Sequence, residues 1–195
     1  MHSHQIIIQQ TQYWLEHIII GLNFCPFAKH EFQHQTIRYA VDNNTDLEAT
    51  LMVLTKELEY LDHHPCTQQK SNDLNYTGTQ TTLIIFTQAF SDFDAFLDLI
   101  ELANHLIDDL GYSATYQLAH FHPQYCFDGV TADDASNYTN RSPYPILHLL
   151  REDGMQLAIE RHPNTSQIPD ANIALARKLG AVKIQKIIDK GMKIK

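Results

Sequence analysis

Apolar residues follow two kinds of spacing along the 195-residue chain, and each kind predicts a different element. Apolar positions three and four residues apart are typical of amphipathic helices, whereas short β-branched apolar runs are typical of buried strands. The helical pattern covers residues 5–22, 47–61 and 91–110, and it returns at 153–160 and in a C-terminal pair at about 170–190. The strand pattern covers residues 36–41, 82–87, 114–121 and 146–150.

Capping and breaking residues predict where these elements end. Thr45 and Glu48 form a reciprocal capping pattern at the start of the second helix, and Pro65 ends that helix because proline lacks an N–H donor. Ser91 and Asp94 are expected to cap the long third helix. Residues 66–80 are almost wholly polar and are expected to form an exposed loop.

The order of the elements predicts the fold class. Strands that alternate with helices are joined by right-handed crossovers, which places them in a largely parallel sheet. A chain of 195 residues is long enough for one substantial core and short for two. We therefore expect a single α/β domain over residues 1–195, with helical segments at 5–22 and 170–190 and a mixed, mostly parallel sheet of about four strands flanked by helices.

Composition excludes several classes of partner. With 14 Lys and Arg against 23 Asp and Glu, the net charge of -9 repels a phosphate backbone, so no nucleic-acid partner is expected. The apolar runs are far shorter than the roughly 20 residues that a bilayer requires, so no membrane span is expected. The first residues lack the features of a secretory signal, and 3 cysteines without close pairing suit a reducing compartment, so the expected location is the cytoplasm. The sequence indicates no particular cofactor or oligomeric state.

One long polar segment carries most of the candidate chemistry. Residues 122–145 lack a periodic apolar pattern, and long structureless loops in compact domains are uncommon unless they are functional. Ligands bind at the carboxyl ends of parallel strands, where His122 is expected to lie.

Within this segment, Asn140, Arg141 and Ser142 place a planar cation beside amide and hydroxyl groups. That combination suits a carboxylate or a phosphate, so a small anionic molecule is the expected partner. Alternatively, Arg141 pairs with an acid of its own loop, Asp133 or Asp134, without a ligand.

Histidines near this segment are candidate bases or ligands. An unperturbed imidazole titrates near neutral pH, so His122 is a candidate general base or metal ligand. His148 lies inside the last predicted strand, where a core imidazole bonded to main chain is the alternative. His120, His122 and Cys126 have a spacing compatible with a metal site that Cys25 or His148 completes, although the usual zinc spacings are absent.

Cys25 precedes Pro26, where a helix is expected to begin. Main-chain N–H groups and the helix dipole favour a thiolate at that place, so Cys25 can be a nucleophile. The alternative is a small buried apolar residue in a turn. Residues 24–28 (FCPFA) resemble the cysteine motif of omega-class glutathione transferases, but there the motif follows a strand and here it follows a helix, so no thioredoxin fold is expected.

Four stretches together resemble an uncharacterised bacterial family known as domain of unknown function 1415. They are Trp14 with residues 20–28 (IGLNFCPFA), 121–123 (FHP), 137–145 (NYTNRSPYP) and 147–152 (LHLLRE). The similarity runs from about Trp14 to Gly180. It implies membership and no established activity.

The resemblance sharpens the set of candidate residues. The candidate residues that fall on motif positions are Asn23, Cys25, Pro26, His122, Asn137, Asn140, Arg141, Ser142, His148 and Arg151. His120 and Cys126 depart from the motif, which weakens the metal alternative. Scaffolds rarely need Asn, Cys, His and Arg together, so we expect one composite site.

The leading hypothesis is a small-molecule enzyme that transfers an acyl or related group. In it, Cys25 is the nucleophile and His122 the base, while Arg141 holds an anionic group of the substrate. The expected binding residues are Asn23, Asn137, Asn140, Arg141, Ser142, His148 and Arg151. A non-catalytic protein that binds or senses an anionic metabolite is one alternative, and a metal-binding protein is the other.

Overall fold

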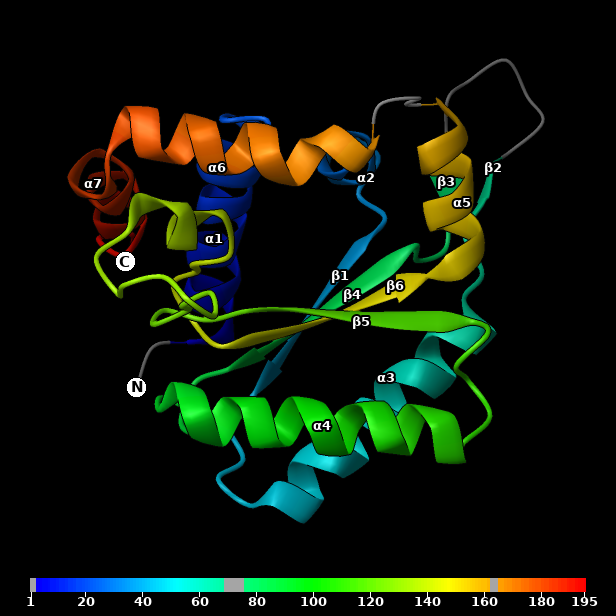
Figure 1. Ribbon diagram of the computed structural model, residues 1–195. Helices are drawn as coiled ribbons and strands as arrows, with labels where there is room; N and C mark the ends of the chain where they lie inside the picture. Colours follow the sequence, from blue (N-terminus) through cyan, green and yellow to red (C-terminus); the bar gives the residue numbers. More distant parts are fainter. Residues whose placement is uncertain (1–2, 69–75, 162–164) are drawn as a thin grey trace.

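A computed structural model describes residues 3–68, 76–161 and 165–195, and its centre is a four-stranded mixed sheet (Figure 1). The strands are β1 (Ile37–Asp42), β4 (Thr81–Phe86), β5 (Tyr116–Phe121) and β6 (Ile146–Arg151), in the order β1-β4-β6-β5. The pair β1–β4 is parallel, whereas β6 runs antiparallel to both β4 and β5. Three of the four strands therefore run in one direction, as predicted, but β6 separates β4 from β5 and makes two of the three pairings antiparallel.

Two layers of helices cover the sheet (Figure 1). On one face lie α3 (Leu47–His63) and α4 (Phe93–Asp109), and on the other lie α1 (His4–Trp14), α6 (Ile168–Leu179) and α7 (Ala181–Gly191). Asp46 and Asp92 cap α3 and α4 by accepting main-chain N–H groups. The predicted cap residues of α4, Ser91 and Asp94, are thus replaced by Asp92, which has the extended conformation that a cap requires.

The other described elements connect these strands and helices. They are η1 (Leu15–Ile20), α2 (Ala28–Gln33), β2 (Thr67–Gln68), β3 (Tyr76–Thr77), η2 (Ala135–Thr139), α5 (Glu152–Arg161) and η3 (Thr165–Gln167). The strands β2 and β3 form a short antiparallel pair within the stretch predicted as an exposed loop. Residues 69–75 of that stretch lie outside the described part.

Burial explains why β4 and β6 occupy the centre. All six residues of β4 are buried, and Ile146, Leu147 and Leu149 of β6 are exposed by 1% or less. Strands that are apolar on both faces gain most from a position between two helical layers. Alternate residues then divide between the layers: Leu83 and Ile85 face α1 and α7, while Ile84 and Phe86 face α3 and α4.

No described helix is long and apolar enough to cross a membrane.

Candidate functional site

The turn that presents Cys25 is built by an unusual helix end. After α1 the chain widens into the π-helix η1, where Gly21 N–H donates to Glu16 O at 2.9 Å. A Cβ on Gly21 would lie 2.6 Å from the main-chain oxygen of His17. The close approach of these two main-chain segments therefore requires glycine at position 21. Such π-turns are frequent at functional sites because they redirect the chain.

The turn continues through Asn23, whose φ of 56° is left-handed. Asparagine tolerates this conformation better than most residues. Its side chain is exposed, so the structure gives Asn23 a main-chain role in aiming the next residues. Phe24 and Cys25 then donate their N–H groups to Ile19 O at 2.9 and 3.3 Å.

A cavity of about 370 Å³ lies where this turn meets β5, the loop after it and α6. Its apolar wall consists of Ile19, Phe24, Phe121, Phe127, Ile168, Pro169 and Ile173. Its polar wall consists of Cys25, Thr139, Asn140 and Asn172. The two predicted walls, the Cys25 turn and the polar loop, therefore meet around one cavity.

Cys25 is a half-buried thiol in this wall. Burial raises the pKa of the Cys25 thiol, and hydrogen bonds from the N–H groups of Phe27 and Ala28 lower it by a smaller amount. Among the described residues that line the cavity, Cys25 is the one titratable group. The cavity thus holds a mostly protonated thiol at neutral pH, without an adjacent base.

Asn140 supplies a free side-chain donor to the cavity wall. Its Oδ1 accepts a hydrogen bond from the Thr139 hydroxyl at 3.0 Å, and its main-chain oxygen accepts from His122 N–H at 3.2 Å. Its Nδ2 donates to no residue that the structure describes. A ligand with an acceptor oxygen can therefore bind to Asn140 without displacing a protein bond.

Arg141 is engaged by the loop that carries it. Its Nε donates to Tyr125 O at 3.1 Å and its Nη2 donates to Ala132 O at 2.6 Å. The guanidinium also lies over the Tyr138 ring, 4.7 Å from the centroid. Asp134, one of the two acids predicted as its alternative partner, pairs instead with Arg177 at 2.9 Å. Arg141 thus holds the loop through carbonyl oxygens.

Asn137 and Ser142 also brace this loop. Asn137 is fully buried, accepts from Phe127 N–H at 3.0 Å and donates to Thr131 O at 2.9 Å. Ser142 is buried and donates to Tyr144 O at 2.5 Å. Neither side chain is among the residues of the cavity wall.

His122 packs on the α4 face of the sheet, whereas Cys25 packs on the opposite face, with α1, α6 and α7. It is fully buried and packs against Phe93 and Phe96 of α4, with ring centroids 5.1 Å from each. Its Nδ1 accepts from Gln124 N–H at 3.0 Å, so Nε2 carries the proton and donates to Phe90 O at 2.8 Å. Burial lowers the pKa of His122, while the bond to Phe90 and the charge of Asp92 raise it. Both nitrogens are occupied, and His122 is not in the cavity wall.

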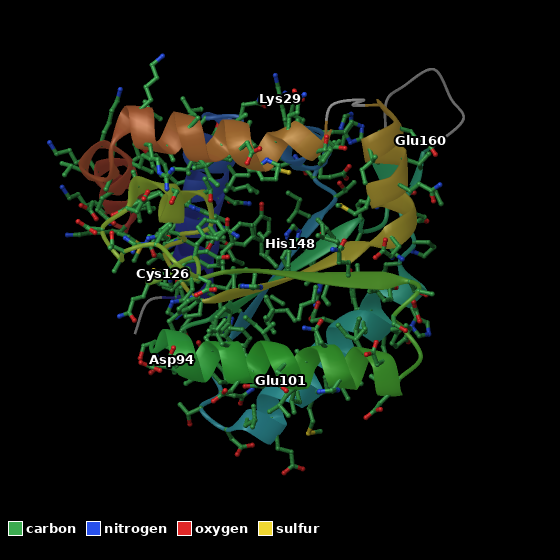
Figure 2. The ribbon with its side chains drawn as sticks, in the orientation of Figure 1. Lys29, Asp94, Glu101, Cys126, His148 and Glu160 are labelled. Atoms are coloured by element: carbon green, nitrogen blue, oxygen red, sulfur yellow. The ribbon has the colours of Figure 1, made fainter. Side chains whose placement is uncertain are left out.

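His148 and Arg151 occupy opposite faces of β6. His148 points toward the α6 side of the sheet (Figure 2), and its Nε2 lies 2.6 Å from the Thr81 hydroxyl. Burial lowers the pKa of His148 to about 4. Arg151 donates to Thr79 O at 3.1 Å, to the Tyr116 hydroxyl at 3.2 Å and to Leu61 O. Arg151 thereby ties β6 to the end of α3, away from the cavity.

The metal alternative gains no support from this geometry. His122 has no free nitrogen, and the thiol of Cys126 lies 3.4 Å from Val130 O as a donor. Within residues 3–68, 76–161 and 165–195, no group of three or more His, Cys, Asp or Glu side chains is arranged to hold a metal ion.

Of the predicted site residues, the structure brings Cys25 and Asn140 together at the cavity. The predicted residues outside its wall are His122, Asn23, Asn137, Arg141, Ser142, His148 and Arg151. Sequence reasoning missed Asn172 and Ile173, because a single amide inside an amphipathic helix has no distinguishing pattern.

Together, the fold and the cavity define an α/β protein with a thiol-bearing, mainly apolar pocket. The chain belongs to the family described as "Protein of unknown function (DUF1415)", whose model matches residues 6–186. The predicted resemblance is therefore confirmed. Searches of the curated proteins and of the solved structures each found no match.

Proposed function

We propose that the protein binds a small, largely apolar molecule in the Cys25 cavity. The observation that carries the proposal is the cavity itself, about 370 Å³, with an apolar wall and the free Nδ2 of Asn140. Ligand pockets are typically apolar with a few placed polar groups that fix orientation. Asn140 would orient the ligand through an acceptor oxygen.

The ligand proposed here differs in charge from the anionic molecule that the sequence predicts. The guanidinium of Arg141 is bonded to carbonyl oxygens of its own loop, and the described cavity wall contains no cationic side chain. Transfer of an anion into such a wall is costly without a paired charge. We therefore propose a neutral ligand.

A matched pair of probes tests both points. Benzamide is neutral and carries an acceptor oxygen, whereas benzoate has nearly the same shape and a negative charge. In calorimetric titrations we expect benzamide to bind more tightly than benzoate, and Ile173→Trp, which fills the cavity, to abolish binding. Val182→Trp is the control, because Val182 is 71% exposed on α7. Equal benzamide binding to wild type and Ile173→Trp would contradict the proposal.

A second candidate, group transfer through Cys25, is favoured by the position of its thiol in the cavity wall. A nucleophilic thiol needs a lowered pKa or a nearby base. Here burial raises the pKa of Cys25, and the described wall supplies no base, so the substrate itself would have to accept the proton.

Alkylation at graded pH tests this candidate. With Cys66 and Cys126 replaced by Ser, iodoacetamide reports on Cys25 alone. Nucleophilic catalysis predicts that a bound substrate analogue shifts the reaction of Cys25 to lower pH. A pH profile at or above that of an ordinary thiol, unchanged by benzamide, would leave binding as the function.

A further inference from the structure

His30 of α2 and His34, the C-cap residue of that helix, lie side by side, away from the Cys25 cavity wall. His30 and His34 are one helical turn apart, and their ring centroids are 4.2 Å apart with an interplanar angle of 36°. The Tyr76 ring of β3 packs against both at steep angles, with centroids 5.1 and 4.7 Å away. Tyr76 thus limits the rotamers of the two imidazoles.

Hydrogen bonds fix which nitrogen of each ring is free. His30 Nδ1 lies 2.9 Å from Glu31 Oε1, and His34 Nδ1 lies 2.7 Å from the main-chain oxygen of His30. A carboxylate and a carbonyl oxygen only accept, so both Nδ1 atoms carry the proton. In the neutral rings, each Nε2 then has an available lone pair. Neither Nε2 has a hydrogen bond to a described residue.

The acceptor of His30 is itself held in place. The hydroxyl of Thr36, a buried residue, donates to the Glu31 carboxylate and to Glu31 O. Histidines that bind metals usually donate their other N–H to a carboxylate or a main-chain carbonyl, which fixes the ring and raises its basicity. His30 shows the first arrangement and His34 the second.

We propose that His30 and His34 chelate one divalent first-row transition-metal ion through their Nε2 atoms, with water completing the coordination. Imidazole suits Ni²⁺, Cu²⁺ and Zn²⁺, and the affinity of such a site rises from Mn²⁺ to Ni²⁺. The site needs two protein ligands, so it is compatible with the lack of a three-residue cluster in the described chain. A bound ion would stabilise α2, the helix that follows the Cys25 turn.

Calorimetric titration of the full-length protein tests the site. Ni²⁺ is expected to bind with one equivalent that disappears in His30→Asn/His34→Asn, while Mn²⁺ gives no such equivalent. The matched control is His63→Asn/His64→Asn. Those two histidines also bond through Nδ1 to main-chain oxygens, but their rings pack on no second histidine in the described chain. Glu31→Gln keeps both ligands and is expected to weaken binding about 10–100-fold.

Two readouts separate loss of the site from loss of the fold. Ni²⁺ is expected to raise the Tm of wild type and of the control, and to leave the Tm of the double variant unchanged. In wild type, NMR signals of the His30 and His34 rings should respond to Zn²⁺ at one equivalent. The proposal is overturned if those signals do not respond, or if the double variant keeps the Ni²⁺ equivalent.

Discussion

Asn172 of α6 donates a hydrogen bond from Nδ2 to the main-chain oxygen of Phe24, with an N···O distance of 2.6 Å. Both residues line the cavity, and 148 positions of sequence separate them. The bond ties the C-terminal helical layer to the turn that presents Cys25. The position of the thiol in the cavity therefore depends on a residue of α6.

Replacement of Asn172 by alanine is expected to loosen this turn. The Phe24 carbonyl loses its partner, which costs about 1–2 kcal/mol of unfolding free energy. Because the turn then opens more often, Cys25 should also react faster with iodoacetamide. Denaturant unfolding and alkylation rates measure the two effects. Asn104→Ala is the control, since Asn104 bonds to Ile100 O within α4 on the surface; an equal effect of both variants would speak against the proposed tie.

The buried imidazole of His122 gives a second prediction. In His122→Phe, the Phe90 oxygen and the Gln124 N–H lose their partners, and unfolding free energy is expected to fall by on the order of 2–4 kcal/mol. His105→Phe should change little, because that side chain is 71% exposed. Benzamide affinity of the folded His122→Phe protein should stay near that of wild type. A selective loss of binding with unchanged stability would instead assign His122 to the site.

Substitutions of Arg141 can separate the effect of its positive charge from the effect of its hydrogen-bonding geometry. Its guanidinium spans two carbonyl oxygens, a geometry that a lysine cannot reproduce. Arg141→Lys and Arg141→Met are therefore expected to destabilise the protein by similar amounts, about 1–3 kcal/mol. Arg177→Lys, at a surface ion pair, should cost less. If Arg141→Lys matched wild type while Arg141→Met did not, an anion-binding role would be favoured over the loop role.

The helices and strands could be predicted because apolar residues recur along the chain at helical and strand spacings. The pairing of the strands in the sheet could not be predicted. The apolar runs that form β4 and β6 are visible in the sequence. The insertion of β6 beside β4 depends on contacts between distant segments, such as Leu83 opposite His148. A local pattern carries no record of such a pairing. In the structure, β4 and β6 are more fully buried than β1 and β5, in agreement with their central position in the sheet.

The candidate site was predicted in part for a related reason. Polar residues in a long loop serve either a ligand or the carbonyl and N–H groups of that loop, and the sequence does not distinguish the two. Asn137 and Arg141 bond to the loop itself, since their partners are main-chain groups. Cys25 and Asn140 reach the cavity. The catalytic and anion-binding roles given to these residues stay predictions.

His148 makes stability depend on pH. The Thr81 hydroxyl donates to Leu149 O at 2.5 Å and so accepts from His148 Nε2–H, and burial lowers the pKa of His148 from 6.5 to about 4. The unfolded chain then binds more protons than the folded one between these two values. Stability from the neutral ring is therefore complete above pH 6.5 and is lost as pH falls toward 4, by at most about 3 kcal/mol.

Urea unfolding between pH 7.5 and 5 measures this loss while most carboxylates remain ionised. The free energy of unfolding of wild type should fall across the range, and His148→Gln, which can still bond to Thr81 but does not titrate, should flatten the fall. His105→Gln is the control, because an imidazole that is 71% exposed keeps nearly the same environment on unfolding. The half-buried ring of His120 and the buried ring of His122 also have lowered pKa values, so some slope should remain in His148→Gln. An unchanged slope in His148→Gln would show that its ring is already solvated in the folded protein.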